Sequence, residues 1–181
     1  MAILRALQRR PPPSTEARTY ALSGVPDGVD GTIVTLDIMR RMVREYRTNP
    51  HILNFARSLV AGVRGKDFAG EAALLQNWVR DNIRYTQDVY DVETLQTPIV
   101  TLNVRHGDCD DQSTLLATLL NAIGHEVRFV AVGFSPDNFE HVLVETKIGE
   151  QWLPAETTEA VRFGEHPWQP GEVLTRINRE I

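Results

Sequence analysis

The sequence contains a single cysteine, Cys109, among its 181 residues. An intramolecular disulfide is therefore excluded, and the thiol is either a small apolar side chain of the core or a reactive group. A chain of this length hides roughly two-thirds of its unfolded surface on folding, so it needs neither disulfides nor a structural metal to be stable.

The chain also lacks long hydrophobic runs and an excess of positive charge. Its longest apolar stretches, such as residues 129–132, are far shorter than the about 20 residues that cross a bilayer. Nineteen Lys and Arg against 24 Asp and Glu give a net charge of −5, which argues against a surface that binds nucleic acid. We therefore expect neither a membrane span nor a nucleic-acid partner.

The first residues show no apolar segment followed by a small-residue cleavage site, so they predict no signal peptide. Without a leader or disulfides, we expect the protein in the cytoplasm or within an assembled particle. Three prolines at positions 11–13 favour an extended conformation, and glycine and aspartate recur between residues 23 and 32. Residues 1–31 are accordingly predicted to form an extended N-terminal arm, suited to docking onto a protein partner.

The whole chain has the composition and length of one ordinary globular domain, with 42% hydrophobic and 24% charged residues. Apolar residues recur at helical spacing in four segments. The expected helices cover residues 34–46, 50–62, 67–83 and 109–123. Residues 85–105 lose this periodicity and carry Pro98, which predicts an irregular connection. We interpret residues 32–68 as a helical preface and residues 69–181 as the core of the domain.

After Gly124 the apolar residues alternate with polar ones, which is typical of strands. The expected strands cover residues 127–132, 141–146 and 151–154. The short turn at residues 148–151 predicts that the last two strands form an antiparallel hairpin. Helices followed by strands indicate an α+β fold, in which a central helix that carries the cysteine packs on an antiparallel sheet.

Cys109 lies at the start of the most apolar of the expected helices, within the sequence RHGDCDDQS. If Asp108 caps this helix, the unpaired N–H groups of the first turn favour a thiolate at Cys109. The carboxylates of Asp110 and Asp111 oppose negative charge on the same sulfur. The balance between these effects is not decided by the sequence.

A catalytic thiol needs a base, and the base needs a third group that orients it. His141 is the histidine that begins an expected strand, and Glu156 follows the next strand. The hairpin between these strands would bring the carboxylate toward the imidazole. The other histidines are interpreted as surface, capping or helix residues: His51, His106, His125 and His166.

Three segments in this order resemble the transglutaminase-like superfamily of papain-like cysteine enzymes. They are GDC at 107–109, EHVLVE at 140–145 and WLPAETT at 152–158. The stretches at 81–88 and 119–134 are also similar to the superfamily, and the resemblance extends over about residues 69–160. It implies a papain-like core without a cofactor, in which Cys109 is the nucleophile, His141 the base and acid, and Glu156 the orienter. The family usually has Asp where this chain has Glu156.

The resemblance, which includes small bacterial-type members with peptidase or amidase character, implies acyl transfer through a thioester on the cysteine. Hydrolysis of a peptide, isopeptide or amide bond is ranked above transfer to an amine, so the expected partner is a protein or peptide substrate. The oxyanion would be bound by the Cys109 backbone N–H and a second donor, for which Asn103 and Gln96 are the candidates.

Two alternatives remain open at this point. The same fold could be non-catalytic and act as a binding or assembly component of a larger particle, such as a phage virion. A metal site is the other alternative, because cysteine and histidine are zinc ligands. Its ligands would be His106, Asp108, Cys109 and His141.

Overall fold

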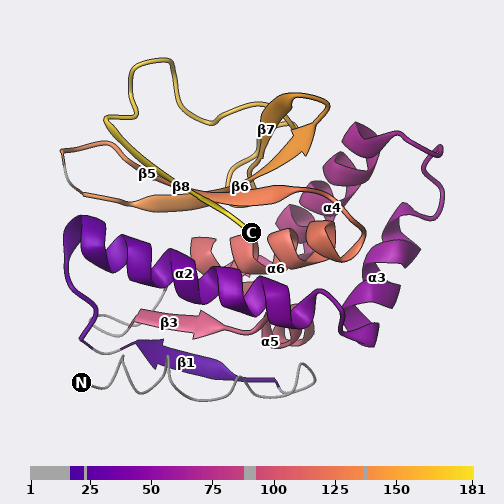
Figure 1. Cartoon of the computed structure of the whole chain (residues 1–181), viewed down its shortest axis with the longest axis horizontal. Coiled ribbons are helices and arrows are strands. Elements are labelled where there is room, and N and C mark those ends of the chain that lie inside the picture. The colour runs from indigo at the N-terminus through magenta and orange to yellow at the C-terminus, as the bar shows by residue number, and fades with distance from the viewer. Residues whose placement is uncertain (1–16, 23, 88–92, 137) are drawn as a thin grey trace.

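The computed structural model describes residues 17–22, 24–87, 93–136 and 138–181 (Figure 1). The helices of these residues are α2 (Gly28–Tyr46), α3 (Pro50–Val60), α4 (Phe68–Asn82), α5 (Pro98–Val104) and α6 (Cys109–Ala122). The strands are β1 (Thr19–Leu22), β2 (Arg84–Tyr85), β3 (Glu93–Gln96), β4 (His106–Gly107), β5 (Val127–Gly133), β6 (His141–Ile148), β7 (Gln151–Ala155) and β8 (Thr175–Glu180). Residues 1–16, most of the predicted arm, lie outside the described residues.

The elements form three layers, as Figure 1 shows. One layer is an antiparallel sheet with the strand order β7-β6-β5-β8. Helices α2, α4 and α6 pack beneath the sheet and form the second layer. The antiparallel pair of β1 and β3 lies with α5 on the side of these helices that faces away from the sheet. The α+β architecture predicted from the sequence is therefore confirmed, with a cysteine-bearing helix against an antiparallel sheet.

The predicted hairpin is also confirmed. Strands β6 and β7 pair from Ile148 opposite Gln151 to Val144 opposite Ala155. This register places the residue after Ala155 near the beginning of β6, which is where His141 lies. On the other edge, β5 pairs with β6 so that Val132 is opposite His141.

Several parts of the chain differ from the sequence-based expectation. Helix α2 begins at Gly28, whereas the sequence predicted a start near residue 34. The first turn was missed because it is rich in glycine and lacks apolar periodicity. The segment expected to be irregular, 85–105, contains β3 and α5, which begins with Pro98 at its first position. Strand β8 was not predicted, since the sequence TRINRE is mostly charged and polar. The domain boundaries at 31 and 68 stay a prediction, although Thr19–Leu22 of the predicted arm forms β1.

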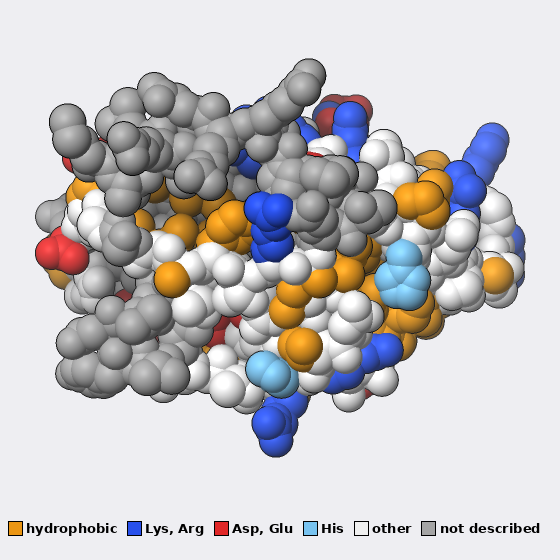
Figure 2. All heavy atoms as spheres, turned by 90° about the horizontal axis from the view of Figure 1, so that it is seen from below, with side chains coloured by type: hydrophobic (Ala, Val, Ile, Leu, Met, Phe, Trp, Pro, Cys, Tyr) orange, Lys and Arg blue, Asp and Glu red, His pale blue; other side chains and the backbone are white. Residues whose placement is uncertain are grey.

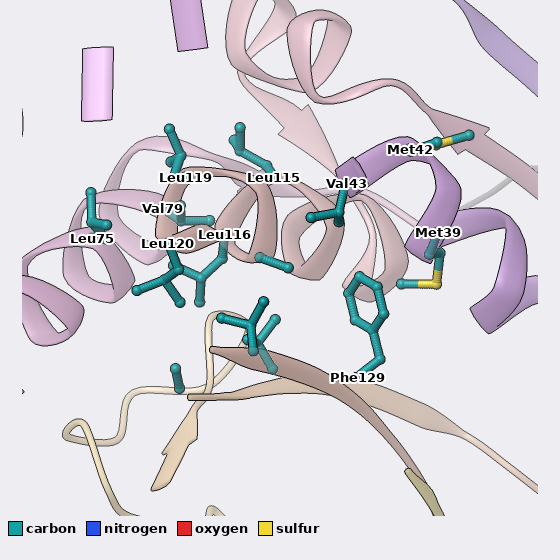
Figure 3. Close-up of a cluster of buried hydrophobic side chains, with 14 of the residues drawn as sticks. Met39, Met42, Val43, Leu75, Val79, Leu115, Leu116, Leu119, Leu120 and Phe129 are labelled. Atoms are coloured by element: carbon teal, nitrogen blue, oxygen red, sulfur yellow. The ribbon is translucent and has the colours of Figure 1, made fainter. Parts of the chain in front are cut away.

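Helix α6 is the centre of the hydrophobic core (Figure 3). Every residue from Asp111 to Leu120 is buried, because helices pack on one side of α6 and the sheet covers the other. Figure 3 shows apolar side chains from four elements meeting around α6, and Phe129 of the sheet is among them. The labelled residues are Met39, Met42, Val43, Leu75, Val79, Leu115, Leu116, Leu119, Leu120 and Phe129. The start of α6 is consequently held rigidly at the edge of the core.

No helix in the described part of the chain is both long and apolar enough to cross a membrane. Figure 2 shows the face on the side of β1 and β3, where basic side chains stand both at the rim and near the middle. Hydrophobic side chains on this face occur in small groups between polar ones.

Replacing a core leucine of α6 should destabilise the whole domain. We expect Leu116→Ala, at a fully buried position, to lower the free energy of unfolding by about 2–5 kcal/mol through lost burial and a cavity. Leu74→Ala, on the exposed side of α4, should change it by less than about 0.5 kcal/mol. Urea unfolding followed by circular dichroism measures both, and equal losses would contradict the central position of α6.

Candidate active site

Cys109 occupies the first position of α6. Asp108 precedes it with extended backbone, and the Asp108 carboxylate accepts a hydrogen bond from the Asp111 backbone N–H. The first N–H groups of a helix have no partner within it, and they carry the positive end of the helix dipole. The sulfur therefore lies beside donors that can stabilise negative charge on it or on an atom bonded to it.

The chain that leads to Cys109 is held on both sides. Arg105 has left-handed backbone with φ 62°, and its guanidinium lies over the ring of Trp78, 4.5 Å from the centroid. The next residues pair with β2 in parallel, and Gly107 is opposite Tyr85. A Cβ at Gly107 would lie 2.6 Å from the Cβ of Asp111. Glycine is thus needed for the chain to pass so close to the helix.

Ser113, one turn into α6, ties the helix to the strand that carries His141. Its hydroxyl donates a 3.1 Å hydrogen bond to the carbonyl oxygen of Val142. Both residues are buried. Ser113 is four residues after Cys109 and Val142 follows His141 directly, so this bond fixes the separation of the two elements next to the reactive side chains.

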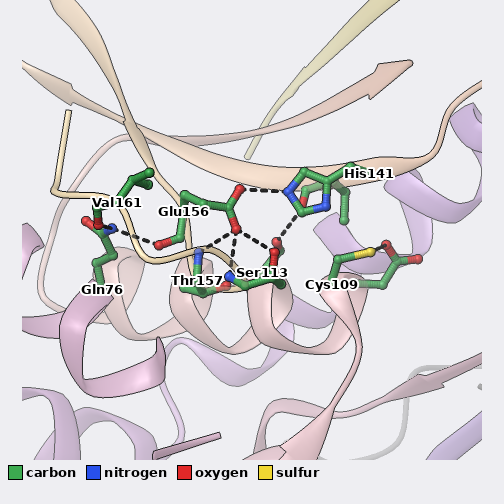
Figure 4. A network of polar contacts seen from close by, with 10 residues as sticks. Gln76, Cys109, Ser113, His141, Glu156, Thr157 and Val161 are labelled. Atoms are coloured by element: carbon green, nitrogen blue, oxygen red, sulfur yellow. Dashed lines mark hydrogen bonds and ion pairs between the residues drawn. The ribbon is translucent and has the colours of Figure 1, made fainter. Parts of the chain in front are cut away.

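The imidazole of His141 lies between Cys109 and Glu156 (Figure 4). Its Nε2 is 2.7 Å from the Glu156 Oε2. In Figure 4 the other ring nitrogen, Nδ1, is turned toward the side on which Cys109 lies. The carboxylate accepts a hydrogen bond from the Nε2–H and thereby leaves Nδ1 as the nitrogen with a free lone pair when the ring is neutral. This is the tautomer that a base for the Cys109 thiol requires.

Glu156 is buried, and both of its carboxylate oxygens are used. While Oε2 faces His141, Oε1 accepts hydrogen bonds from the backbone N–H groups of Thr157 and Thr158 and from the Thr158 hydroxyl. The Glu156 backbone is fixed as well, since the Gln76 side-chain amide donates to its carbonyl oxygen at 2.7 Å. The added methylene relative to Asp is therefore accommodated, and the longer side chain reaches the imidazole.

These contacts decide the charge of Glu156. Burial raises the pKa of its carboxyl, but the hydrogen bond and charge of His141 and the donors of Thr158 outweigh it, so the pKa lies below the ordinary value. Glu156 is consequently ionised near neutral pH and stabilises an imidazolium at His141.

The proton on Cys109 is held differently. The Sγ donates to the Asp110 carboxylate at 3.6 Å. Burial, and then the negative charges of Asp110 and Asp108, raise the pKa of the Cys109 thiol well above its ordinary value, against the lowering effect of a hydrogen bond with the Val142 backbone. In this arrangement burial and the two carboxylates keep the proton on the sulfur, so it is a neutral thiol until a base removes that proton.

A cavity of about 860 Å³ lies in front of the sulfur. The walls come from the elements that carry Cys109 and His141 on one side and from α2 and the residues before it on the other. The lining residues are Leu22, Gly24, Val25, Pro26, Asp27, Gly28, Gly31, Thr32, Thr35, Leu36, Tyr85, Gln87, Asp108, Cys109, Asp110, Ala131, Phe139, Glu140, His141 and Val142. Both Cys109 and His141 thus face a space large enough for a peptide segment.

Trp168 is an aromatic neighbour of the imidazole. Its ring makes an edge contact with His141, with centroids 6.2 Å apart, and stacks on His166 at 4.9 Å. Trp168 also packs on Val130, Val132 and Leu143, the smaller apolar cluster of the sheet. The His141 ring is thereby supported from the loop between β7 and β8.

The structure brings together the three residues predicted as nucleophile, base and orienter, whereas the two predicted oxyanion donors lie elsewhere. Gln96 uses its backbone N–H on Asp111 and its side-chain amide on the His106 carbonyl, and Asn103 is exposed on α5. Neither is among the described residues that line the cavity.

Tyr85 and Gln87 do line it, and sequence reasoning missed them. Both lie in the stretch 81–88, whose similarity to the superfamily was the available signal. The described residues contain no group of three or more His, Cys, Asp and Glu side chains that could hold a metal ion.

Residues 54–157 match the family model of the transglutaminase-like superfamily. The chain belongs to this superfamily. A search of curated proteins finds no match. The superfamily match covers more than half of the chain and includes every residue of the Cys109, His141 and Glu156 arrangement.

Among solved structures, this transglutaminase-like chain is similar to a proposed cysteine protease from Cytophaga hutchinsonii. The TM-score is 0.51 and the identity 15%, over 78% of this chain and 51% of that one. It is also similar to a proposed protease from Parabacteroides distasonis, with a TM-score of 0.51 and 12% identity over 82% of this chain and 37% of that one. The chain thus spans about half or less of the length of these proteins, and the likeness concerns the fold.

Removing the charge of Asp110 should make Cys109 more acidic. In Asp110→Asn the thiol loses both a carboxylate acceptor and a nearby negative charge, so we expect its pKa to fall and alkylation at pH 7 to become several-fold faster. The pH dependence of iodoacetamide alkylation, followed by mass spectrometry, measures this shift. Asp81→Asn, on the exposed end of α4, is the control, and an unshifted profile in Asp110→Asn would contradict the assignment.

Glu156→Gln should weaken the fold and remove part of its pH dependence. A neutral amide has one acceptor oxygen, so an NH₂ group must face either the His141 N–H or the threonine donors, at a cost of about 1–3 kcal/mol. Because the pKa of Glu156 is lowered on folding, its contribution is complete above the unfolded value of about 4.3 and is lost as pH falls through the folded value.

We therefore expect wild-type stability to fall below about pH 4.3 more steeply than that of the variant. Urea unfolding between pH 3 and 7 measures both curves. Glu150→Gln, in the exposed turn between β6 and β7, should keep the wild-type slope. Parallel curves for wild type and Glu156→Gln would refute the role of the carboxylate.

Proposed function

We propose that this protein is a thiol-dependent acyl transferase that hydrolyses a peptide, isopeptide or amide bond through a thioester on Cys109. The observation that carries the proposal is the imidazole of His141, bonded to the buried Glu156 at 2.7 Å with its other nitrogen turned toward Cys109. A buried carboxylate, an imidazole and a thiol in this order are the parts of a nucleophile with its base and orienter. Membership in the transglutaminase-like superfamily and the fold of the proposed proteases support it.

Acylation begins when the His141 Nδ1 takes the proton of the Cys109 Sγ, and the thiolate forms a bond to the carbonyl carbon. Glu156, ionised and held by three donors, stabilises the imidazolium. The backbone N–H groups at the start of α6 lie where the oxyanion develops. The imidazolium then gives its proton to the leaving amine, and the carbon–nitrogen bond breaks to leave the thioester.

Deacylation reverses the roles with water in place of the amine. His141 takes a proton from water, the hydroxide oxygen bonds to the thioester carbon, and the thiolate leaves and recovers its proton. If an amine enters instead of water, the same steps yield a new amide, which is the transglutaminase-type alternative. The second alternative is that the protein is a non-catalytic member of the superfamily. It is favoured by the hydrogen bond from the thiol to Asp110 and by the raised pKa of Cys109.

Acylation by p-nitrophenyl acetate tests the proposal without knowledge of the substrate. We expect a burst of one p-nitrophenol per chain and an acetyl group on Cys109, both absent in Cys109→Ala. His141→Ala should acylate about 10²–10⁴-fold more slowly, because it lacks the general base. His51→Ala, an exposed histidine in the first turn of α3, is the matched control and should acylate at the wild-type rate.

Adding glycine methyl ester then separates the two fates of the thioester. Acetate as the product identifies hydrolysis, and acetylglycine methyl ester identifies amine transfer. A wild-type protein that shows no burst, and whose alkylation by iodoacetamide does not change in His141→Ala, would establish the non-catalytic alternative.

A further inference from the structure

The cavity in front of Cys109 carries a surplus of negative charge. Four carboxylates line it, and none of its described lining residues is a lysine or an arginine. They come from different parts of the fold: Asp27 lies before α2, Asp108 and Asp110 flank the sulfur, and Glu140 precedes His141. The charge therefore surrounds the place where a substrate must sit.

The carboxylate of Glu140, next to His141, is not neutralised by its hydrogen-bond partners. Glu140 accepts hydrogen bonds from the Ser135 hydroxyl at 3.2 Å and the Asn138 amide at 2.7 Å, and both donors are neutral. On the opposite wall, Asp27 makes no side-chain cap to α2. Both carboxylates are exposed, so water screens them in the free protein and a bound substrate would displace part of that water.

The positive ends of the two helices that begin at the cavity do not cancel its negative charge. The N-termini of α2 and α6 each contribute roughly half a positive charge, and this effect falls off within one helical turn. Together they supply about one positive charge against four carboxylates. Their N–H groups suit an oxyanion at the sulfur, whereas the wider cavity attracts cations.

Small residues of α2 form part of the cavity wall. Gly28, Gly31, Thr32 and Thr35 recur along one face of α2 and all line the cavity. This wall lies before residue 54, outside the segment that matches the superfamily. Part of the shape of the cavity, and the charge of Asp27, are therefore features of this chain beyond the superfamily core.

We propose that the cavity binds a peptide segment carrying a lysine or arginine next to the carbonyl that Cys109 attacks. This inference rests on the proposed function for the reaction, while the charge preference itself follows from the lining residues. A bound ammonium or guanidinium near Asp110 would offset the carboxylate that opposes a thiolate. The cationic substrate would thus favour the reactive form of the nucleophile that it meets.

Charged thiol reagents measure the preference directly, because the chain has a single cysteine. The probes are cationic 2-(trimethylammonium)ethyl methanethiosulfonate and anionic 2-sulfonatoethyl methanethiosulfonate. We expect the ratio of cationic to anionic rates at Cys109 to exceed that of free cysteine by about three- to tenfold, and to fall as salt is added.

Glu140→Gln and Asp27→Asn should each lower this ratio by about twofold. Both residues are exposed, so the substitutions should leave the fold intact. Glu150→Gln, which removes the same charge far along the β6–β7 hairpin, should leave the ratio unchanged. A wild-type ratio equal to that of free cysteine, or an equal effect of all three substitutions, would overturn the inference.

A second measurement compares p-nitrophenyl esters of acetyl-lysine and acetyl-norleucine, which differ in the charged end of the side chain. We expect acylation of Cys109 by the lysine ester to be about tenfold faster, and equal rates would overturn the inference while leaving the proposed function standing. If neither ester acylates Cys109, the proposed function fails, and the reagent ratio still decides the charge preference of the cavity.

Discussion

The burial of helix α6 is the constraint on which the rest of the structure depends. Its residues from Asp111 to Leu120 are enclosed by helices and by the sheet, so the helix cannot shift without opening the core. The Cys109 sulfur lies two residues before this enclosed stretch begins at Asp111, at the point where the helix reaches the cavity. A rigid helix thereby holds a side chain that must meet an imidazole from another layer.

Specific hydrogen bonds align the sheet with helix α6 next to Cys109 and His141. The Ser113 hydroxyl on the Val142 carbonyl joins helix and sheet beside the reactive groups, and the β6–β7 register carries Glu156 back to His141. The carboxylate has no freedom to turn, because its far oxygen is bound by the residues that follow it. The orientation of the imidazole is thus a consequence of strand pairing and of a local turn, both encoded within residues 141–158.

The sequence predicted best where periodicity and burial agree. Helix α6 and the β6–β7 hairpin were predicted nearly to the residue, since their apolar residues follow one clear period. Strand β8 was missed because its pairing with β5, not its own composition, makes it a strand. Likewise the short α5 lies in a segment without periodicity, and its helical form depends on Pro98 and on packing against α6.

Site residues, like the elements, could be predicted where a local sequence pattern marks them and not where they depend on tertiary contacts. The residues Cys109, His141 and Glu156 could be found because each lies at an element boundary with a recognisable pattern. The cavity wall on α2 could not, since no local pattern shows that residues about 80 positions before the cysteine face it. The direction of the Cys109 pKa shift was also out of reach, because it depends first on how deeply the thiol is buried and then on how close the carboxylates of Asp110 and Asp108 lie.

The division of the cavity between two parts of the chain has an evolutionary consequence. The residues proposed for the chemistry lie within the superfamily core, whereas the facing wall comes from a segment before it. Mutations in that segment can change which molecules fit without touching the thiol, imidazole or carboxylate. New specificities can therefore arise by substitutions on the face of α2 that lines the cavity, while Met39, Met42 and Val43 of the same helix stay packed around α6.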